Sequence, residues 1–268
     1  MTATAEMVRE PKLKFTDPLL KKIAEYWNEH IHDLELAEHP IGTKGFFADL
    51  EEYRFDKLRY LPNLVNFNGY KGKKLLEVGC GIAIDLVKFA RGGAQVTGMD
   101  LAEQSIDLAK KYFEHEGLQG EFRLGNGEEL EFEDNSFDVV YAHGVIQYTS
   151  DAQKMVNELH RVVKPGGEVI MMVYNRNSWL SFMSEKFGIS LEHEDAPVLK
   201  RYSIGEFTEL LKPFSQVRLL PERFPVKSRL QKGLKAAVFN QIFVPVFNLI
   251  PKSITRSTGW HLMAFATK

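Results

Sequence analysis

The order of apolar and polar residues divides the 268-residue chain into a helical start and a longer alternating part. Up to residue 17 the chain is polar and broken by proline. Apolar residues then recur every three or four positions, which predicts amphipathic helices over 18–32 and 46–64. From residue 75 onward, short apolar runs alternate with helical segments. This alternation predicts an α/β fold in which helices cover both faces of a parallel sheet.

Seven short apolar runs are predicted to be the strands of this sheet. They cover residues 75–78, 94–99, 120–124, 137–142, 168–174, 216–220 and 260–267. Helices are expected between them, among others over 102–116 and 151–163. The sequence Lys-Pro-Gly-Gly at 164–167 is a typical stop for the second of these helices.

The turn after the first strand carries the first chemical signal. Glu77 ends the strand, and Gly79 and Gly81 follow before the spacing becomes helical. A strand, a glycine turn and a helix N-terminus form the nucleotide cradle of open α/β sheets. Asp100 ends the next strand, where a carboxylate can accept hydrogen bonds from both hydroxyls of a ribose. The pattern therefore predicts a cofactor that contains a nucleoside.

Two classes of cofactor fit such a cradle, a nicotinamide dinucleotide and a sulfonium nucleoside. The dinucleotide fingerprint requires a small residue at its third position, because helix and strand must pack closely there. Counted from Gly79, that position is Ile84. The fingerprint fails at the residue that makes it specific, which disfavours a nicotinamide oxidoreductase.

Composition narrows the classes of function further. The net charge of -2 gives no reason to expect a nucleic-acid partner, and 44% apolar residues with 26% charged residues are typical of a soluble globular protein. The single cysteine, Cys80, excludes an internal disulfide and a multi-cysteine metal site, and no metal is expected. The N-terminus lacks the pattern of a secretory signal, and no window is apolar enough to span a membrane, so we expect a cytoplasmic location.

From residue 74 to 174 the sequence resembles the class I S-adenosylmethionine-dependent methyltransferases, in the group that includes the ubiquinone and menaquinone C-methyltransferases. The motifs that carry the resemblance are specific in their order and spacing. They are LEVGCG at 76–81, VTGMDL at 96–101, GNGEEL at 125–130, NSFDVV at 135–140 and RVVKPGG at 161–167. The resemblance implies a Rossmann-like, mostly parallel sheet of seven strands, whose last strand is antiparallel and inserted between the fifth and sixth. It also implies S-adenosylmethionine as cofactor and a small-molecule methyl acceptor.

Carried onto this chain, the resemblance implies a set of cofactor contacts. Glu77 and the backbone at 79–81 would hold the methionine end, Asp100 the ribose, residues 101 and 126–128 the adenine, and residues 142–143 the methyl side. The implied contacts are Glu77, Gly79, Cys80, Gly81, Asp100, Leu101, Asn126, Gly127, Glu128, Ala142 and His143. Two positions depart from the family pattern. Ala83 stands at its third glycine, and Asn126 at the usual aspartate beside the adenine.

Methyl transfer needs a general base only where the acceptor is a protonated hydroxyl, amine or carbon acid. His143 is the first candidate, since it follows the fourth strand at the edge where open α/β sheets bind ligands. It could equally be a loop histidine that touches only the cofactor. The other candidates are Tyr148, Tyr174, His30 and His32. The many aromatic residues favour an apolar or aromatic acceptor, and a cofactor-binding partner protein without catalysis is the alternative function.

The expected organisation is an N-terminal arm and helical cap (1–70), a cofactor-binding core (71–222), an insertion (223–257) and a final core strand (258–268). The insertion has basic edges and an apolar middle. It fits three roles, namely a cover over the active site, a dimer contact, or peripheral contact with an anionic membrane surface. The sequence leaves these roles open, and with them the choice between monomer and homodimer. Pro245 argues against one straight amphipathic helix across the insertion.

Overall fold

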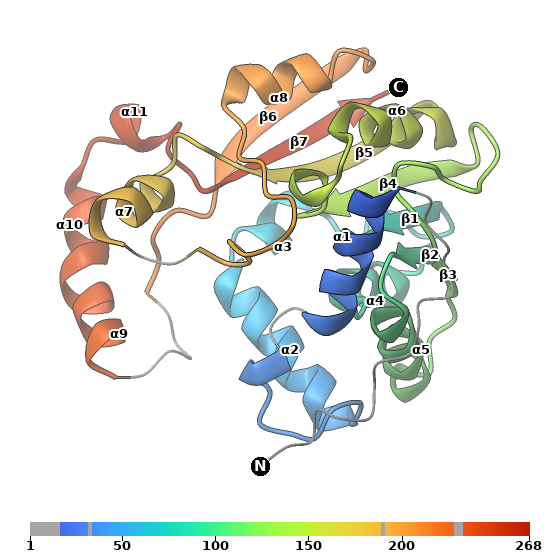
Figure 1. The fold of residues 1–268 in the computed structure, drawn as a ribbon, viewed down its shortest axis with the longest axis horizontal. Helices are drawn as coiled ribbons and strands as arrows, with labels where there is room; N and C mark the ends of the chain where they lie inside the picture. Colours follow the sequence, from blue (N-terminus) through green and yellow to red (C-terminus); the bar gives the residue numbers. More distant parts are fainter. Residues whose placement is uncertain (1–16, 32–33, 189–190, 228–232) are drawn as a thin grey trace.

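A sheet of seven strands forms the centre of the computed structural model in Figure 1, which describes residues 17–31, 34–188, 191–227 and 233–268. The candidate base His32 lies outside the described residues. The strands are β1 (Lys74–Val78), β2 (Gln95–Asp100), β3 (Glu121–Leu124), β4 (Phe137–His143), β5 (Val163–Tyr174), β6 (Gln216–Glu222) and β7 (His261–Thr267). Their order in the sheet is β3-β2-β1-β4-β5-β7-β6.

The directions of the strands confirm the predicted Rossmann-like sheet. All pairs from β3 to β5 are parallel, whereas β7 runs antiparallel to both of its neighbours, with Ala264 opposite Met171 of β5 and Leu219 of β6. The last strand is thus inserted between the fifth and the sixth. The strand order changes direction between β1 and β4, so the carboxyl ends of these two strands border the crevice where such sheets bind ligands.

Helices lie on both faces of the sheet. They are α1 (Pro18–Glu29), α2 (Lys44–Lys57), α3 (Leu61–Leu64), α4 (Ile84–Arg91), α5 (Glu103–Glu116), α6 (Ala152–Val162), α7 (Trp179–Phe187), α8 (Ile204–Leu210), α9 (Leu234–Val238), α10 (Val244–Leu249) and α11 (Lys252–Thr255). The N-terminal helices α1 and α2 contact α5, and α2 also contacts α4 (Figure 1). The segment before the sheet therefore packs on the face that carries α4 and α5.

Two predicted boundaries need correction. The helix predicted over 46–64 is divided into α2 and α3, with Pro62 in the first turn of α3. A proline within one long helix would clash with the carbonyl group of Leu58, four residues earlier, so the chain leaves the helix there. Residues 164–167, predicted as a helix stop, already belong to β5, which begins at Val163, the predicted end of the helix; Val163 pairs with Phe137 of β4.

Each face of the sheet has its own apolar core. Leu75 and Leu76 are both fully buried, but Leu75 belongs to the core with α2, α4 and α5, and Leu76 to the core with α6 and α8. Successive side chains of a strand point to opposite faces. A central parallel strand is covered on both sides, which explains why Leu75, Leu76 and Val78 are all apolar; Glu77 is the exception in the run at residues 75–78.

The insertion forms a helical column at the edge of the molecule, seen at the left of Figure 1. α9, a π turn (Phe239–Phe243) and α10 follow one another without a break, and the residues at both joints have helical backbone angles. Pro245 does not interrupt this path. It lies in the first turn of α10, where an N–H is not needed, and the wider π turn precedes it. The path is helical throughout, with one change in its hydrogen-bond pattern.

Candidate active site

The turn between β1 and α4 is fixed by backbone hydrogen bonds and by a glycine. The N–H groups of Gly79 and Cys80 both donate to the carbonyl group of Met99 in β2, at 2.7 and 3.0 Å. Gly79 has a φ of +69°, and a Cβ there would lie 2.3 Å from Cγ2 of Val145, so only glycine fits. A Cβ on Gly81 would meet nothing within 4 Å. The space beside the second glycine is open, and a ligand can approach the backbone there.

Asp100 faces the same turn from the end of β2. Its Oδ2 accepts a hydrogen bond from the N–H of Gly81 at 2.8 Å, and its Oδ1 accepts one from the N–H of Ala102 at 2.9 Å. The two bonds hold the carboxyl group at the wall of a cavity. Burial raises the pKa of Asp100 above its usual value. Hydrogen-bond donors on a ligand would stabilise the ionised form of this group.

Glu77 has a buried carboxylate oxygen that the fold does not satisfy. Its side chain is 4% exposed, and its Oε2 has no hydrogen-bond partner among the described residues. Burial, followed by repulsion from Asp85, raises the pKa of Glu77 well above its usual value. A buried carboxylate oxygen without a donor is costly, and this one lines the cavity. A cationic ligand group, such as the ammonium of a methionine, fits this position.

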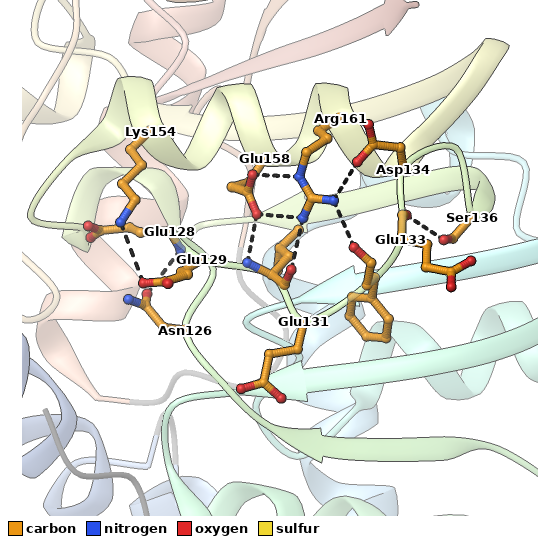
Figure 2. Close-up of polar contacts among 12 residues, drawn as sticks. Asn126, Glu128, Glu129, Glu131, Glu133, Asp134, Ser136, Lys154, Glu158 and Arg161 are labelled. Carbon is orange, nitrogen blue, oxygen red and sulfur yellow. Dashed lines mark hydrogen bonds and ion pairs between the residues drawn. The ribbon is translucent and has the colours of Figure 1, made fainter.

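The segment that follows β3 is held in place by side chains of α6, as Figure 2 shows. Arg161 donates to the carbonyl groups of Leu130 and Phe132 at 2.8 and 2.7 Å. Glu158 accepts a hydrogen bond from the N–H of Leu130 at 2.8 Å and is paired with Arg161. The arginine that opens the motif at 161–167 therefore positions the loop that carries the adenine candidates.

Within that loop, Asn126 and Glu128 already make hydrogen bonds. Oδ1 of Asn126 accepts from the N–H of Glu128 at 3.0 Å. The Glu128 carboxylate accepts from the N–H and the hydroxyl of Ser150, in each case at 2.7 Å. Glu128 thus ties the loop after β3 to the loop after β4. Asn126 and Gly127 line the cavity, and an amide oxygen can accept a second hydrogen bond, so Asn126 could still contact an adenine.

The side chain of Ala142 lies away from the cavity. It is fully buried in the core with α6 and α8, whereas its neighbour in β4, His143, lines the cavity. The alternation of side chains along a strand separates the two. Ala142 was predicted to contact the cofactor, and the structure does not bring its side chain to the site.

The other predicted site residues within the described chain border one continuous cavity at the carboxyl ends of β1 and β4. They are Glu77, Gly79, Cys80, Gly81, Asp100, Leu101, Asn126, Gly127, Glu128, His143, Tyr148, Tyr174 and His30. Beyond the glycine turn, aromatic rings gather around the same cavity, with ring centroids 4.8 to 6.0 Å apart. We call this part the aromatic half, and it consists of Trp27, His30, His143, Tyr148, Tyr174 and His261.

His143 is joined to a buried ion pair. Arg54 of α2 binds Asp85 of α4 through two hydrogen bonds of 3.0 and 2.5 Å, and the hydroxyl of Tyr141 donates to Asp85 at 2.8 Å. The same guanidinium donates to Nδ1 of His143 at 3.1 Å. Burial and the positive charge of Arg54 lower the pKa of His143 to about 3. The imidazole of His143 is therefore neutral at physiological pH.

The hydrogen bonds beyond His143 fix which ring nitrogens carry hydrogen. A guanidinium can only donate hydrogen bonds. Arg54 therefore donates to Nδ1 of His143, and Arg223 donates to Nε2 of His261 at 3.2 Å. The hydrogens of the neutral rings then lie on Nε2 of His143 and Nδ1 of His261, which are 3.2 and 2.6 Å from the hydroxyl oxygen of Tyr60. Tyr60 accepts both and directs its own hydrogen towards the sulfur of Met263. His143 has no lone pair left with which to act as a base.

Sequence reasoning missed the members of this network, which are Arg54, Tyr60, Asp85, Arg223 and His261. Asp85 gave a faint signal, because a carboxylate in the first turn of α4 stands among residues of the buried face. Nothing in the spacing of the others links them, and Tyr60 and His261, which lie 201 positions apart, meet only in the fold.

The remaining candidates differ in what their polar atoms can do. The hydroxyls of Tyr148 and Tyr174 lie 3.4 Å apart, and burial raises the pKa of Tyr174 to about 12 and that of Tyr148 further. Both are neutral phenols that can position a ligand. Nδ1 of His30 lies 2.9 Å from the carbonyl oxygen of Tyr26, so it must carry the hydrogen. Nε2 of His30 then has a lone pair with no partner among the described residues, at the edge of the cavity.

Comparisons with known proteins identify relatives of this chain. Residues 76–171 match a family described as Methyltransferase domain. A ubiquinone biosynthesis O-methyltransferase of Idiomarina loihiensis is 35% identical over 148 residues, which are 54% of this chain and 60% of the relative. One of the same description from Salmonella typhi is 35% identical over 140 residues, 51% of this chain and 57% of the relative. The chain thus spans less than two thirds of the curated relatives that it matches.

Solved structures agree on the fold. A geranyl diphosphate C-methyltransferase from Streptomyces coelicolor superimposes with a TM-score of 0.61 at 15% identity, over 94% of this chain and 99% of the other. The PH0226 protein from Pyrococcus horikoshii gives a TM-score of 0.57 at 17% identity, over 91% and 98% of the two chains.

The family match and the strand order agree with each other. Residues 76–171 match a methyltransferase domain, and the sheet has the strand order that the resemblance implied.

Proposed function

We propose that the protein transfers the methyl group of S-adenosylmethionine to an apolar or aromatic small molecule and releases S-adenosylhomocysteine. The observation that carries the proposal is the single cavity, which joins the unsatisfied carboxylate of Glu77 to the aromatic half. A cofactor and an acceptor can therefore share one cavity. Holding two reactants in line can remove about 7–11 kcal/mol of the barrier in ideal cases.

The residues at the glycine turn would hold the cofactor by charge and hydrogen bonds. Glu77 would bind the ammonium of the methionine end, Asp100 the ribose hydroxyls, and Leu101, Asn126 and the N–H of Gly127 the adenine. The bound cofactor supplies a methyl group that is already activated on a sulfonium sulfur. The protein then has to orient the acceptor, exclude water and, for a hydroxyl acceptor, remove a proton.

A hydroxyl on an aromatic ring is the acceptor that we propose. The names of the O-methyltransferases at 35% identity support an oxygen acceptor. Trp27, Tyr148 and Tyr174 offer flat apolar surface for a ring. The hydroxyl of Tyr148 donates to that of Tyr174, and the neutral hydroxyl of Tyr174 can donate to an acceptor oxygen. His30 is the base that we propose, because its Nε2 has a free lone pair and both nitrogens of His143 are engaged.

Replacing His30 by asparagine tests this role. Asparagine can keep the hydrogen bond to the carbonyl group of Tyr26 but cannot take a proton. We expect kcat to fall by about a hundredfold or more, with the affinity for S-adenosylmethionine unchanged. The measurement is release of S-adenosylhomocysteine at saturating acceptor. His115→Asn is the matched control, since His115 lies outside the cavity and should keep the wild-type kcat. A His30→Asn variant with wild-type kcat would remove His30 from the mechanism.

The acceptor itself is found by screening phenols, catechols and apolar hydroxyl compounds with S-adenosylmethionine. We expect turnover with members of the aromatic hydroxyl group and none with hydrophilic amines. Binding of the cofactor without turnover on any acceptor would favour the non-catalytic partner protein. Turnover restricted to nitrogen, sulfur or carbon acceptors would refute the proposed hydroxyl chemistry while keeping the methyltransferase.

A further inference from the structure

The helical column of the insertion exposes a regular row of aliphatic side chains. Leu234, Val238, Ile242, Val246 and Leu249 follow one another at steps of three or four residues, which places them on one side of a helix. All five are exposed, Leu234 by 82%, Ile242 by 59% and Leu249 by 83%. We call these five residues the apolar stripe. A soluble protein rarely leaves such a contiguous row in water unless something binds to it.

The other side of the column attaches it to the body of the protein. The rings of Phe239, Phe243 and Phe247 pack against Trp179 of α7, with centroids 5.7 to 6.4 Å apart. Figure 1 shows α9 and α10 beside α7 at the edge of the molecule, remote from the sheet. Further exposed apolar side chains lie on the neighbouring helices α7 and α11, namely Phe182, Phe187 and Ile254. The aromatic side thus docks the column, and the aliphatic side is left without cover among the described residues.

The part of the sequence that contains the stripe carries charge of one sign. From residue 223 to the C-terminus the sequence contains no Asp or Glu. Its basic residues are Arg223, Lys227, Arg229, Lys232, Lys235, Lys252, Arg256 and Lys268. Lys227, Lys252 and Arg256 are exposed on the segments that flank the column. The rest of the chain is acidic by contrast, since the net charge of the whole is -2.

We propose that the apolar stripe and its flanking basic residues bind the surface of an anionic lipid membrane. An amphipathic helix of this kind inserts its apolar side at the boundary of headgroups and acyl chains, while lysine and arginine are attracted to anionic lipid. The contact is peripheral, because every helix in the described residues is too short or too polar to cross a bilayer. A second copy of the chain is a poorer occupant, since pairing the stripes would bring together two basic segments that contain no acidic residue of their own.

Flotation with lipid vesicles tests the proposal on the full chain. The wild type should float with vesicles of phosphatidylcholine and phosphatidylserine. It should not float with vesicles of phosphatidylcholine alone. The variant Ile242→Ser/Val246→Ser/Leu249→Ser removes the centre of the stripe, and Lys252→Glu/Arg256→Glu reverses the flanking charge. Each should lower the partition coefficient by at least tenfold. High salt should weaken wild-type binding and have little further effect on the charge variant.

Two matched controls distinguish binding through the apolar stripe from nonspecific binding to vesicles. Ile41→Ser/Val217→Ser removes exposed apolar residues elsewhere, and Lys110→Glu reverses an exposed charge on α5. Both should bind vesicles like the wild type, and all variants should bind S-adenosylmethionine in calorimetry, which shows that they are folded. Failure of the wild type to bind anionic vesicles would overturn the proposal. So would a stripe variant that still binds, or a wild-type dimer that the stripe variant converts to a monomer in light scattering.

Discussion

Replacing Glu77 by glutamine is expected to weaken binding of S-adenosylmethionine by about tenfold to a hundredfold. A hydrogen bond to a charged group contributes about 1.5–3 kcal/mol, and glutamine offers no charge to the ammonium of the methionine end. The same variant should raise the melting temperature of the ligand-free protein. The buried carboxylate has an oxygen without a partner among the described residues, and glutamine places no charge there. Calorimetry measures the first effect and thermal unfolding the second.

The raised pKa of Glu77 also gives this prediction a pH dependence. Glu77 binds its proton more tightly in the folded protein than in the unfolded chain, so its protonation stabilises the fold fully at low pH. This stabilisation is lost as the pH rises from the pKa of Glu77 in the unfolded chain to its pKa in the folded protein. The Glu77→Gln variant should not show this loss. The affinity of the wild type for S-adenosylmethionine should rise over the same interval, because the ligand's ammonium binds the ionised form, and in the variant it should stay flat.

Glu222→Gln is the control for the Glu77 experiment. Burial raises the pKa of Glu222 as well, but this residue does not line the cavity, so cofactor affinity should not change. An unchanged affinity in Glu77→Gln would show that the cofactor's ammonium binds elsewhere.

Removing the carboxylate of Asp85 is expected to destabilise the fold by about 3–5 kcal/mol, as is typical when one partner of a buried ion pair is deleted. The side chain of Asp85 is 1% exposed, and Arg54 and Tyr141 both donate to it. Asp85→Ala would leave the guanidinium of Arg54, whose side chain is 23% exposed, without its anion. Chemical denaturation followed by circular dichroism gives the free energy of unfolding, and we expect the loss in ligand-free and cofactor-bound protein alike.

Two further variants serve as controls for the loss of stability in Asp85→Ala. Glu121→Ala breaks the exposed pair with Arg123 and should change the free energy of unfolding by no more than about 0.5 kcal/mol. Arg54→Met/Asp85→Leu removes both charges and should recover part of the stability that Asp85→Ala loses. A loss below about 1 kcal/mol in Asp85→Ala would mean that water reaches the Arg54 guanidinium, contrary to the buried network.

The sequence predicted the fold well because the fold depends on local patterns. The run at 75–78 and the strand–turn–helix at Gly79 are recognised within a few residues. The place of the last strand between the fifth and the sixth was implied by the resemblance to the methyltransferases. The division of the helix at Leu58 was less visible, because it depends on the position of one proline inside an apolar repeat. The π turn before Pro245 depends on how the column packs on Trp179, which no local pattern records.

The candidate site could be predicted only where its residues belong to motifs. Glu77 and Asp100 lie at the ends of strands and Asn126 follows one, and these positions alone placed them at the cavity that they line. Ala142 was misplaced because the motif gave its position in β4 and not the face of the sheet to which its side chain points. The network of Arg54, Tyr60 and His261 joins three distant segments, and its effect is decisive for His143. A histidine that seemed the natural base becomes a neutral hydrogen-bond donor once its partners are known.

The most direct test of the account is a calorimetric titration of wild type and Asp100→Asn with S-adenosylhomocysteine. The account predicts one site in the wild type and an affinity at least about tenfold lower in the variant, since the amide replaces a charged acceptor for the ribose hydroxyls. A folded Asp100→Asn protein that binds like the wild type would contradict the assignment of this cavity. A wild type that binds neither S-adenosylhomocysteine nor S-adenosylmethionine would contradict the account as a whole.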